Sequence, residues 1–191
     1  MSKSLNIWIE GTIIAALATV LSFVPFNIGP SFSVTVGAPV IVLYCLRRGL
    51  VPGLIASFLW GILHIFVGNA SILTPLQGFI EYFVAFGFTG FAGLWAKPVQ
   101  ESVEKRDWKR SSILIVVATV VGTIARYFWH TIAGYYFWGQ YAPEGMSPWI
   151  YSILLNSASA LATGGFTILI LVVISQTTSQ LFTPKRTHFG Y

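Results

Sequence analysis

Five ionisable side chains lie within otherwise apolar stretches of the sequence, and they have the clearest potential for chemistry. They are Glu10, His64, Glu81, Arg126 and His130. An ionisable group is costly in a hydrocarbon environment, so each of them is a candidate for binding a ligand or an ion. The HExxH and Cys/His spacings of zinc sites do not occur. We therefore expect a site for an organic ligand, with no metal and no cofactor.

Aromatic residues crowd the same parts of the chain and indicate which ligand would suit the site. They are Tyr82, Tyr127, Trp129, Tyr135, Tyr136, Phe137, Trp138, Tyr141 and Trp149. A carboxylate among aromatic rings favours an organic cation, because each desolvated ring face adds about 0.5–2 kcal/mol of cation–π attraction. Aromatic rings also form belts at membrane surfaces, and that alternative stays open for each ring taken singly.

The composition indicates that lipid, rather than water, covers this protein. Only 9% of the 191 residues are charged and 55% are hydrophobic, whereas about 25% of a soluble domain is charged. The length predicts one membrane domain, residues 1–191. The lone cysteine, Cys45, excludes a disulfide within the chain. We expect an all-α integral membrane protein.

Six apolar runs predict six transmembrane helices. They cover approximately residues 5–24, 33–46, 50–67, 75–95, 112–137 and 149–175. The first run is long enough to cross a hydrocarbon core of about 30 Å, and we expect it to be a helix rather than a cleaved signal peptide. The second is short for a crossing, so an irregular start is expected there. The charged stretch 97–110 is expected to be a solvated loop.

The distribution of charge predicts how the helices are oriented. Ten of the eleven Lys and Arg residues fall in the two tails, the 47–48 turn and the 97–110 loop. The alternate loops, 25–32, 68–74 and 138–148, contain none. This asymmetry predicts that both termini are cytoplasmic. The net charge of +5 therefore reflects membrane orientation, and no nucleic-acid partner is expected.

The predicted orientation places three polar residues at a similar depth on the outward side. At 1.5 Å per residue, Glu81 lies about 9 Å, Asn156 about 10 Å and His130 about 12 Å below the outer helix ends. Tyr151 lies above Asn156 on the same helix. These positions predict one outward-facing polar site.

The other ionisable residues leave alternatives open. Arg126 is one helical turn from His130 and could either join the site or pair with Glu81 in a structural ion pair. His64 shares a helix face with Trp60, which favours a hydrogen-bonded packing residue. Glu10 is near a cytoplasmic helix end, where we expect it to snorkel.

Several segments of the chain resemble the thiamine-specific substrate-binding (S) component of energy-coupling factor transporters. The resemblance covers nearly the whole sequence and is carried by IAALATVLSFVP, LRRGLVPGLIASFLWGIL, QGFIEYFVAFG and RYFWHTIAGYYFWGQYA. It implies a six-helix bundle in a bacterial plasma membrane, with a thiamine pocket near the extracellular face. The implied substrate-binding residues are Glu81, Tyr82, Arg126, His130, Trp138, Tyr151 and Asn156. Ser31 and Ser71 replace aromatic residues that the family can carry in the loops over its pocket.

The resemblance also implies partners. A membrane coupling subunit would contact the first helix at Thr12 and Ala16, and two ATPase subunits would use the ATP. Thr12/Ala16 and Gly11/Ala15 are both small-xxx-small pairs, which fit either this docking or internal packing. No GxxxxGK[ST] phosphate loop occurs in the chain, so we expect no ATPase or other enzyme activity of its own.

A second function stays open at this point. Glu81, Arg126 and His130 could relay protons in a self-sufficient secondary transporter of a small organic cation. Such transporters often contain inverted repeats, and no repeat is evident between residues 1–95 and 96–191. The sequence therefore favours the thiamine-binding subunit.

Overall fold

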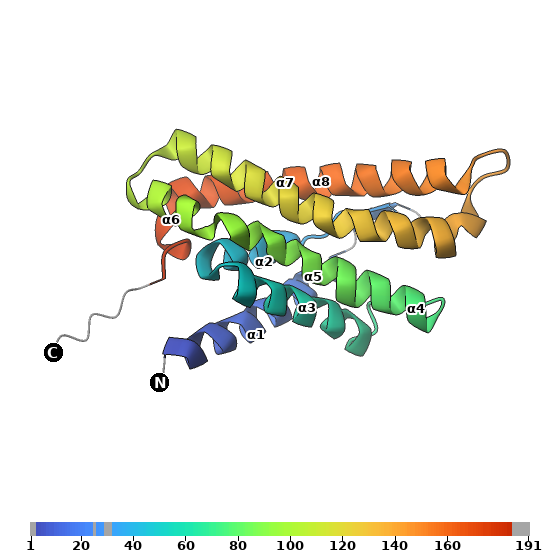
Figure 1. Ribbon diagram of the computed structural model, residues 1–191, viewed down its shortest axis with the longest axis horizontal. Helices are drawn as coiled ribbons and strands as arrows, with labels where there is room; N and C mark the ends of the chain where they lie inside the picture. Colours follow the sequence, from blue (N-terminus) through green and yellow to red (C-terminus); the bar gives the residue numbers. More distant parts are fainter. Residues whose placement is uncertain (1–2, 25, 29–31, 185–191) are drawn as a thin grey trace.

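The computed structural model describes residues 3–24, 26–28 and 32–184, which are almost entirely helical (Figure 1). Three single helices come first: α1 (Lys3–Leu21), α2 (Ala38–Arg48) and α3 (Leu50–Phe66). A short antiparallel pair, β1 (Asn27–Ile28) and β2 (Phe32–Ser33), lies between α1 and α2.

Three longer segments follow, and each combines several kinds of helical turn. The first joins α4 (Pro75–Gly78), the π-helical η1 (Phe79–Ala85), α5 (Phe86–Phe88), the 3-10 helix η2 (Thr89–Trp95) and α6 (Ala96–Glu104). The second joins α7 (Trp108–Ala133), the π-helical η3 (Gly134–Trp138) and the 3-10 turn η4 (Gly139–Tyr141). The third is α8 (Pro148–Thr177), with the 3-10 turn η5 (Ser179–Leu181) after it.

Among the described residues, three of these segments are long and apolar enough to cross a membrane: Pro75–Glu104, Trp108–Tyr141 and Pro148–Thr177. Leu5–Leu21 and Leu50–Phe66 are shorter apolar helices. The nearly all-helical structure confirms the predicted class. Six crossings, cytoplasmic termini and one domain stay predictions.

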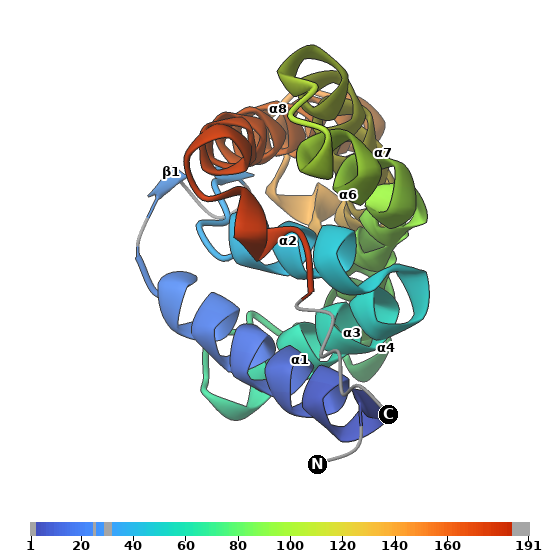
Figure 2. The same ribbon diagram turned by 90° about the vertical axis from the view of Figure 1, so that its left-hand side faces the viewer.

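Helix α2 lies at the centre of the bundle. In Figure 2, α7 and α8 lie on one side of it and α1 and α3 on the other. None of its residues is exposed, and Ile41, Tyr44, Cys45 and Leu46 are fully buried. This interior position explains why its apolar run is short, since α2 packs against protein rather than lipid.

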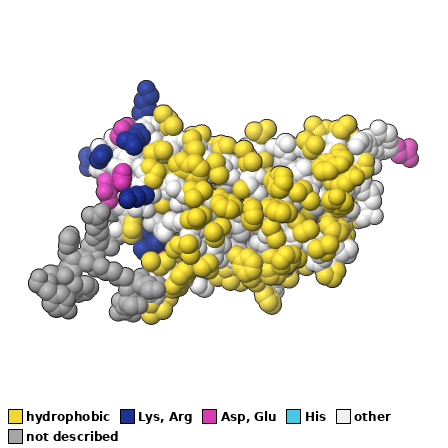
Figure 3. All heavy atoms as spheres, in the orientation of Figure 1, with side chains coloured by type: hydrophobic (Ala, Val, Ile, Leu, Met, Phe, Trp, Pro, Cys, Tyr) yellow, Lys and Arg dark blue, Asp and Glu magenta, His cyan; other side chains and the backbone are white. Residues whose placement is uncertain are grey.

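The outer surface is apolar along most of its length. Figure 3 shows hydrophobic side chains over the body of the molecule and Lys and Arg side chains gathered at the end that carries the turn between α6 and α7. The buried positions include many hydroxyl groups, such as those of Ser57, Thr119 and Thr167. Small and hydroxyl residues let helices pack closely in lipid, where hydrophobicity alone gives no association.

The second predicted helix starts later than its apolar run. Residue 33 belongs to β2, and α2 begins at Ala38. The backbone N–H groups of Ser33 and Thr35 donate to the side chains of Ser159 and Thr163 on α8, both at 3.1 Å. These bonds hold the segment in an extended form. Helix α1 likewise ends at Leu21, three residues before the end of its apolar run.

The stretch 97–110 is not the solvated loop that its charge suggests. Helix α6 continues to Glu104 and α7 begins at Trp108, so only Lys105–Asp107 form the turn. Val99 and Val103 are buried against the bundle, which makes α6 amphipathic. The Asp107 side chain accepts from the Arg110 backbone N–H at 3.1 Å and caps α7.

Glu10 does not snorkel alone but joins α1 to α2. Its carboxylate accepts hydrogen bonds from Nε of Arg47 at 2.7 Å and from Nε of Arg48 at 2.8 Å. Nη1 of Arg47 also donates to the carbonyl oxygens of Gln180, Leu181 and Thr183, at 3.1, 3.0 and 2.9 Å. Arg47 therefore ties α1, α2 and the segment after α8 together.

We expect Arg47→Ala to lower the thermal unfolding temperature in detergent more than Arg48→Ala does. Both substitutions remove a partner of Glu10, but only Arg47 holds the three carbonyl groups. A hydrogen bond to a charged group contributes about 1.5–3 kcal/mol. Melting followed by intrinsic fluorescence compares the two variants, and equal unfolding temperatures would contradict a role for the carbonyl contacts.

Candidate ligand-binding pocket

A cavity of about 260 Å³ lies among α3, η1, α7, η3, α8 and the segment formed by β2 and the two residues after it. Small-molecule pockets usually measure about 300–1,000 Å³, so this one suits a small ligand. Its lining includes all seven residues predicted to bind the substrate: Glu81, Tyr82, Arg126, His130, Trp138, Tyr151 and Asn156. The fold therefore brings them together, while their part in binding stays a prediction.

The pocket lies toward the end of the bundle opposite the basic residues. Ser22 comes directly after α1, Asn69 and Ser71 lie between α3 and α4, and Trp138 ends η3. Arg47 and Arg48 end α2 at the other end, where the α6–α7 turn also lies (Figure 1). The pocket is therefore next to the loops that contain no Lys or Arg.

Two π-helical segments provide the best-defined polar contact in the pocket. Glu81 belongs to η1 and Trp138 to η3. The indole N–H of Trp138 donates to Oε1 of Glu81 at 2.8 Å. Glu81 is only 8% exposed, so this contact lies in a largely dehydrated environment. π-Helical turns are rare and are frequent at functional sites.

Arg126 is surrounded by rings and is not paired with Glu81. Its guanidinium carbon lies 4.1 Å from the ring centre of Phe86 and 4.9 Å from that of Trp60. Nε points to Nε2 of His130 at 3.3 Å. Within the described part of the chain, no ion pair joins Arg126 to a carboxylate, and its buried Nη1 has no hydrogen-bond partner. The structural ion pair considered from the sequence is therefore absent there.

The hydrogen bond from Arg126 also defines which nitrogen of the His130 ring carries the proton. A guanidinium can only donate, so Nε2 of His130 is the acceptor. The proton of the neutral ring is then on Nδ1. His130 consequently has an N–H donor available, and the orphaned Nη1 of Arg126 is a second donor near it.

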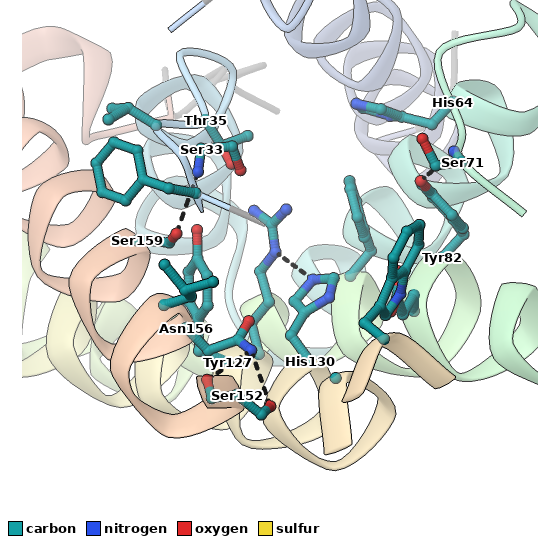
Figure 4. A pocket seen from close by; sticks show the side chains of 18 of the residues that line it. Ser33, Thr35, His64, Ser71, Tyr82, Tyr127, His130, Ser152, Asn156 and Ser159 are labelled. Carbon is teal, nitrogen blue, oxygen red and sulfur yellow. Dashed lines mark hydrogen bonds between the residues drawn. The ribbon is translucent and has the colours of Figure 1, made fainter. Parts of the chain in front are cut away.

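Helix α8 forms a wall of side chains that bond to α7 and to one another (Figure 4). The Asn156 amide nitrogen donates to the backbone oxygen of Ser152 at 3.0 Å and contacts its hydroxyl at 3.3 Å. Ser152 in turn donates to the Thr131 carbonyl oxygen at 2.7 Å. Since its amide nitrogen is engaged, Asn156 can offer its carbonyl oxygen to a ligand.

A second wall comes from the loop between α3 and α4. The Tyr82 hydroxyl accepts from the Ser71 backbone N–H at 2.8 Å, and Gln77 donates to the Ser71 carbonyl oxygen at 3.1 Å. Ser71 thus fixes the loop to η1 through its backbone, although its side chain is small. Ser31, the other departure noted in the sequence, lies outside the described residues.

The lining also includes residues that the sequence did not single out for the site. His64, expected to be a packing residue, faces the cavity from α3, as does Asn69 from the loop after it. Phe86 lies under Arg126. A helical count gives the depth of His64 but not the direction of its ring, so the sequence could not assign it to the pocket.

Comparison with known proteins agrees with this geometry. Residues 8–183 match the model of a family described as thiamine transporter protein. The chain belongs to the thiamine transporter family. Thiamine transporter ThiT of Lacticaseibacillus paracasei is 39% identical over 187 residues, covering 96% of this chain and 93% of that protein. ThiT of Bacillus subtilis is 30% identical over 183 residues, covering 94% and 95% respectively.

A solved structure extends the family match to three dimensions. ThiT from Listeria monocytogenes has a TM-score of 0.94 and 39% identity, covering 96% of this chain and 100% of that one. Together with the membrane-length helices, these matches confirm the resemblance stated from the sequence and a multi-pass location in a bacterial membrane. The relatives are named as transporters, which is consistent with a transporter subunit and not an enzyme.

We expect Gly134→Ala and Gly165→Ala to change stability in opposite directions. A Cβ on Gly134 would overlap the Ser152 hydroxyl and lie 3.0 Å from Nδ2 of Asn156, whereas nothing lies within 4 Å of a Cβ on Gly165. Overpacking costs about 1–3 kcal/mol, and glycine to alanine in an open helical position gains about 0.5–1 kcal/mol. Thermal unfolding in detergent measures both, and a stabilised Gly134→Ala variant would contradict the close packing of η3 against α8.

Proposed function

We propose that this protein is the high-affinity thiamine-binding subunit of an energy-coupling factor transporter. It captures thiamine at the extracellular face for ATP-driven uptake. The main support is the pocket itself, in which one buried carboxylate, Glu81, lies among aromatic side chains and is not neutralised by Arg126. A cationic ring supplies the positive charge that such a carboxylate requires.

Each lining residue then has a role that its chemistry allows. The thiazolium cation faces Glu81 and the aromatic surfaces, and Trp138 stacks on a ring of the ligand. The hydrogen bonds come from Tyr82, His130, Tyr151 and Asn156, and Arg126 adds a donor beside His130. The hydroxyl oxygen of Tyr82 accepts from the Ser71 N–H, which leaves the O–H group of Tyr82 to donate to the ligand.

The orientation follows from the distribution of charge. The chain crosses the membrane six times as one domain, with both termini in the cytoplasm. The basic residues at one end of the bundle support this, because positive charge is retained on the cytoplasmic side. The pocket then faces outward.

Helix α1 has two different small-residue faces, and only one of them is accessible. Ala15 and Ala18 are fully buried, and Gly11 is buried beside Tyr44. Thr12 and Ala16 are exposed. The exposed pair forms the face on which a membrane coupling subunit docks, and that subunit works with two ATPases. Thiamine binding and ATP use therefore belong to different chains.

The counter-charge role of Glu81 predicts that Glu81→Gln weakens thiamine binding by more than tenfold. Removing one partner of a buried charge pair leaves the other uncompensated. Glu144→Gln is the matched control, because Glu144 is exposed in the loop before α8 and does not line the pocket. Quenching of tryptophan fluorescence gives both affinities. Equal affinities for Glu81→Gln and the wild type would refute the role of Glu81.

The docking role of α1 predicts that Ala16→Phe abolishes thiamine uptake by cells but leaves thiamine binding by the purified protein intact. A bulky ring prevents the close helix approach that alanine permits. Leu17→Phe is the control, since Leu17 is an exposed large residue of the same helix. Normal uptake by the Ala16 variant would contradict this docking face. Uptake by liposomes containing this chain alone, driven by a pH gradient, would instead favour a secondary transporter.

A further inference from the structure

A hydrogen bond to the backbone defines the tautomer of the His64 ring. Nδ1 lies 2.9 Å from the carbonyl oxygen of Trp60, one turn earlier on α3. A carbonyl oxygen can only accept, so Nδ1 bears the proton and donates it. In the neutral ring, Nε2 therefore has a lone pair and acts as an acceptor.

The position of the ring is fixed as well. The centres of Phe86 and Trp60 lie 4.8 and 5.6 Å from that of His64, and Tyr82 follows at 6.3 Å. The backbone of His64 is held by the end of α3, where the Asn69 N–H donates to the His64 carbonyl oxygen at 2.9 Å. Gly68, with φ of 74°, makes that left-handed turn possible. His64 cannot easily turn away from the pocket.

Within the part of the chain that the structure describes, the acceptor of His64 has no hydrogen-bond partner. His64 is 5% exposed and lines the cavity, and Figure 4 shows its ring extending from α3 toward the interior. No hydrogen bond from residues 3–24, 26–28 or 32–184 reaches Nε2. The cavity also contains donors, on Arg126 and His130, which contact the same Phe86 ring as His64. An acceptor in a dehydrated pocket is costly unless a ligand donates to it.

We propose that His64 is a ligand-contacting residue that accepts a hydrogen bond through Nε2 from an amino or hydroxyl group of the ligand. It would select ligands that carry a donor on the edge facing α3. This inference rests on the proposed function, since thiamine carries one amino group and one hydroxyl group. Simple packing uses only Nδ1 and the ring faces, whereas recognition of the ligand also uses Nε2.

Two substitutions separate these roles. In His64→Asn, the amide nitrogen can replace Nδ1 as the donor to Trp60, but no acceptor atom reaches the position of Nε2. The glutamine of His64→Gln reaches the Nε2 position and loses the bond to Trp60. We expect His64→Asn to weaken thiamine binding by about 10- to 100-fold, and His64→Gln to bind clearly more tightly than His64→Asn. Equal affinities, or tighter binding by His64→Asn, would overturn the proposal.

Ligand analogues identify the donor. One analogue replaces the amino group with oxygen, and the other replaces the hydroxyl with hydrogen. If His64 contacts the amino group, His64→Asn costs little further affinity for the first analogue but its full effect for the second. The opposite pattern assigns the hydroxyl. A full effect with both analogues shows no coupling to either donor and would overturn the proposal.

A spectroscopic measurement does not depend on the asparagine variant folding. In wild-type protein with ¹⁵N-labelled histidine, thiamine should shift the Nε2 resonance of His64, assigned by its loss in His64→Gln. An unshifted resonance would refute the contact. If the wild-type chain does not bind thiamine, the proposed function and this inference both fail. If it binds and His64→Asn and His64→Gln are equal in affinity, only the inference fails.

Discussion

The hydrogen bond between Trp138 and Glu81 joins two segments of the chain that are both π-helical. A π-helical turn holds more residues than an α-helical turn and changes the direction of the side chains around it. Backbone groups in a membrane must be satisfied within the protein, so irregular turns persist only where neighbouring segments support them. The contact between η1 and η3 provides such support. The shape of the pocket on that side depends on it.

The electrostatics of the interior follow from where Arg126 finds its stabilisation. The faces of Phe86 and Trp60 hold the guanidinium by cation–π contact. A carboxylate partner would have neutralised Arg126 but would also have consumed Glu81. Because rings take that role, the cavity retains one carboxylate and a separate set of donors. The two kinds of group suit a ligand that combines a positive charge with neutral polar edges.

Much of this arrangement could be predicted from the sequence, and the omissions have physical reasons. Apolar runs located the helical segments, and the estimated helical depth placed Glu81, His130 and Asn156 at one level, where all three line the pocket. The sequence could not predict the direction of the Glu81 and Trp138 side chains, because both lie in π-helical turns that shift the angular positions of residues around the helix. His64 lies on the regular helix α3 and was interpreted as a packing residue, because its spacing from Trp60 does not give the direction of its ring. The many charged residues of 97–110 suggested a loop. That interpretation overlooked Val99 and Val103, which are spaced one helical turn apart and are buried on one face of α6. The extended segment before α2 depends on hydroxyl groups of α8, more than 120 residues away.

The central position of α2 bears on how the protein is made. Insertion machinery recognises a segment by its preference for lipid, and a span needs about 20 apolar residues. Helix α2 has 11 residues, ends in two arginines and contains buried or partly buried residues only. Only Gly49 separates it from α3. We therefore expect α2 to enter the bilayer with α3 as a hairpin. It would reach its final environment only when the later segments that pack against it, η2, α6 and α8, are in place. On this view, we expect the bundle to be complete only after α8, the last long helix, has been synthesised.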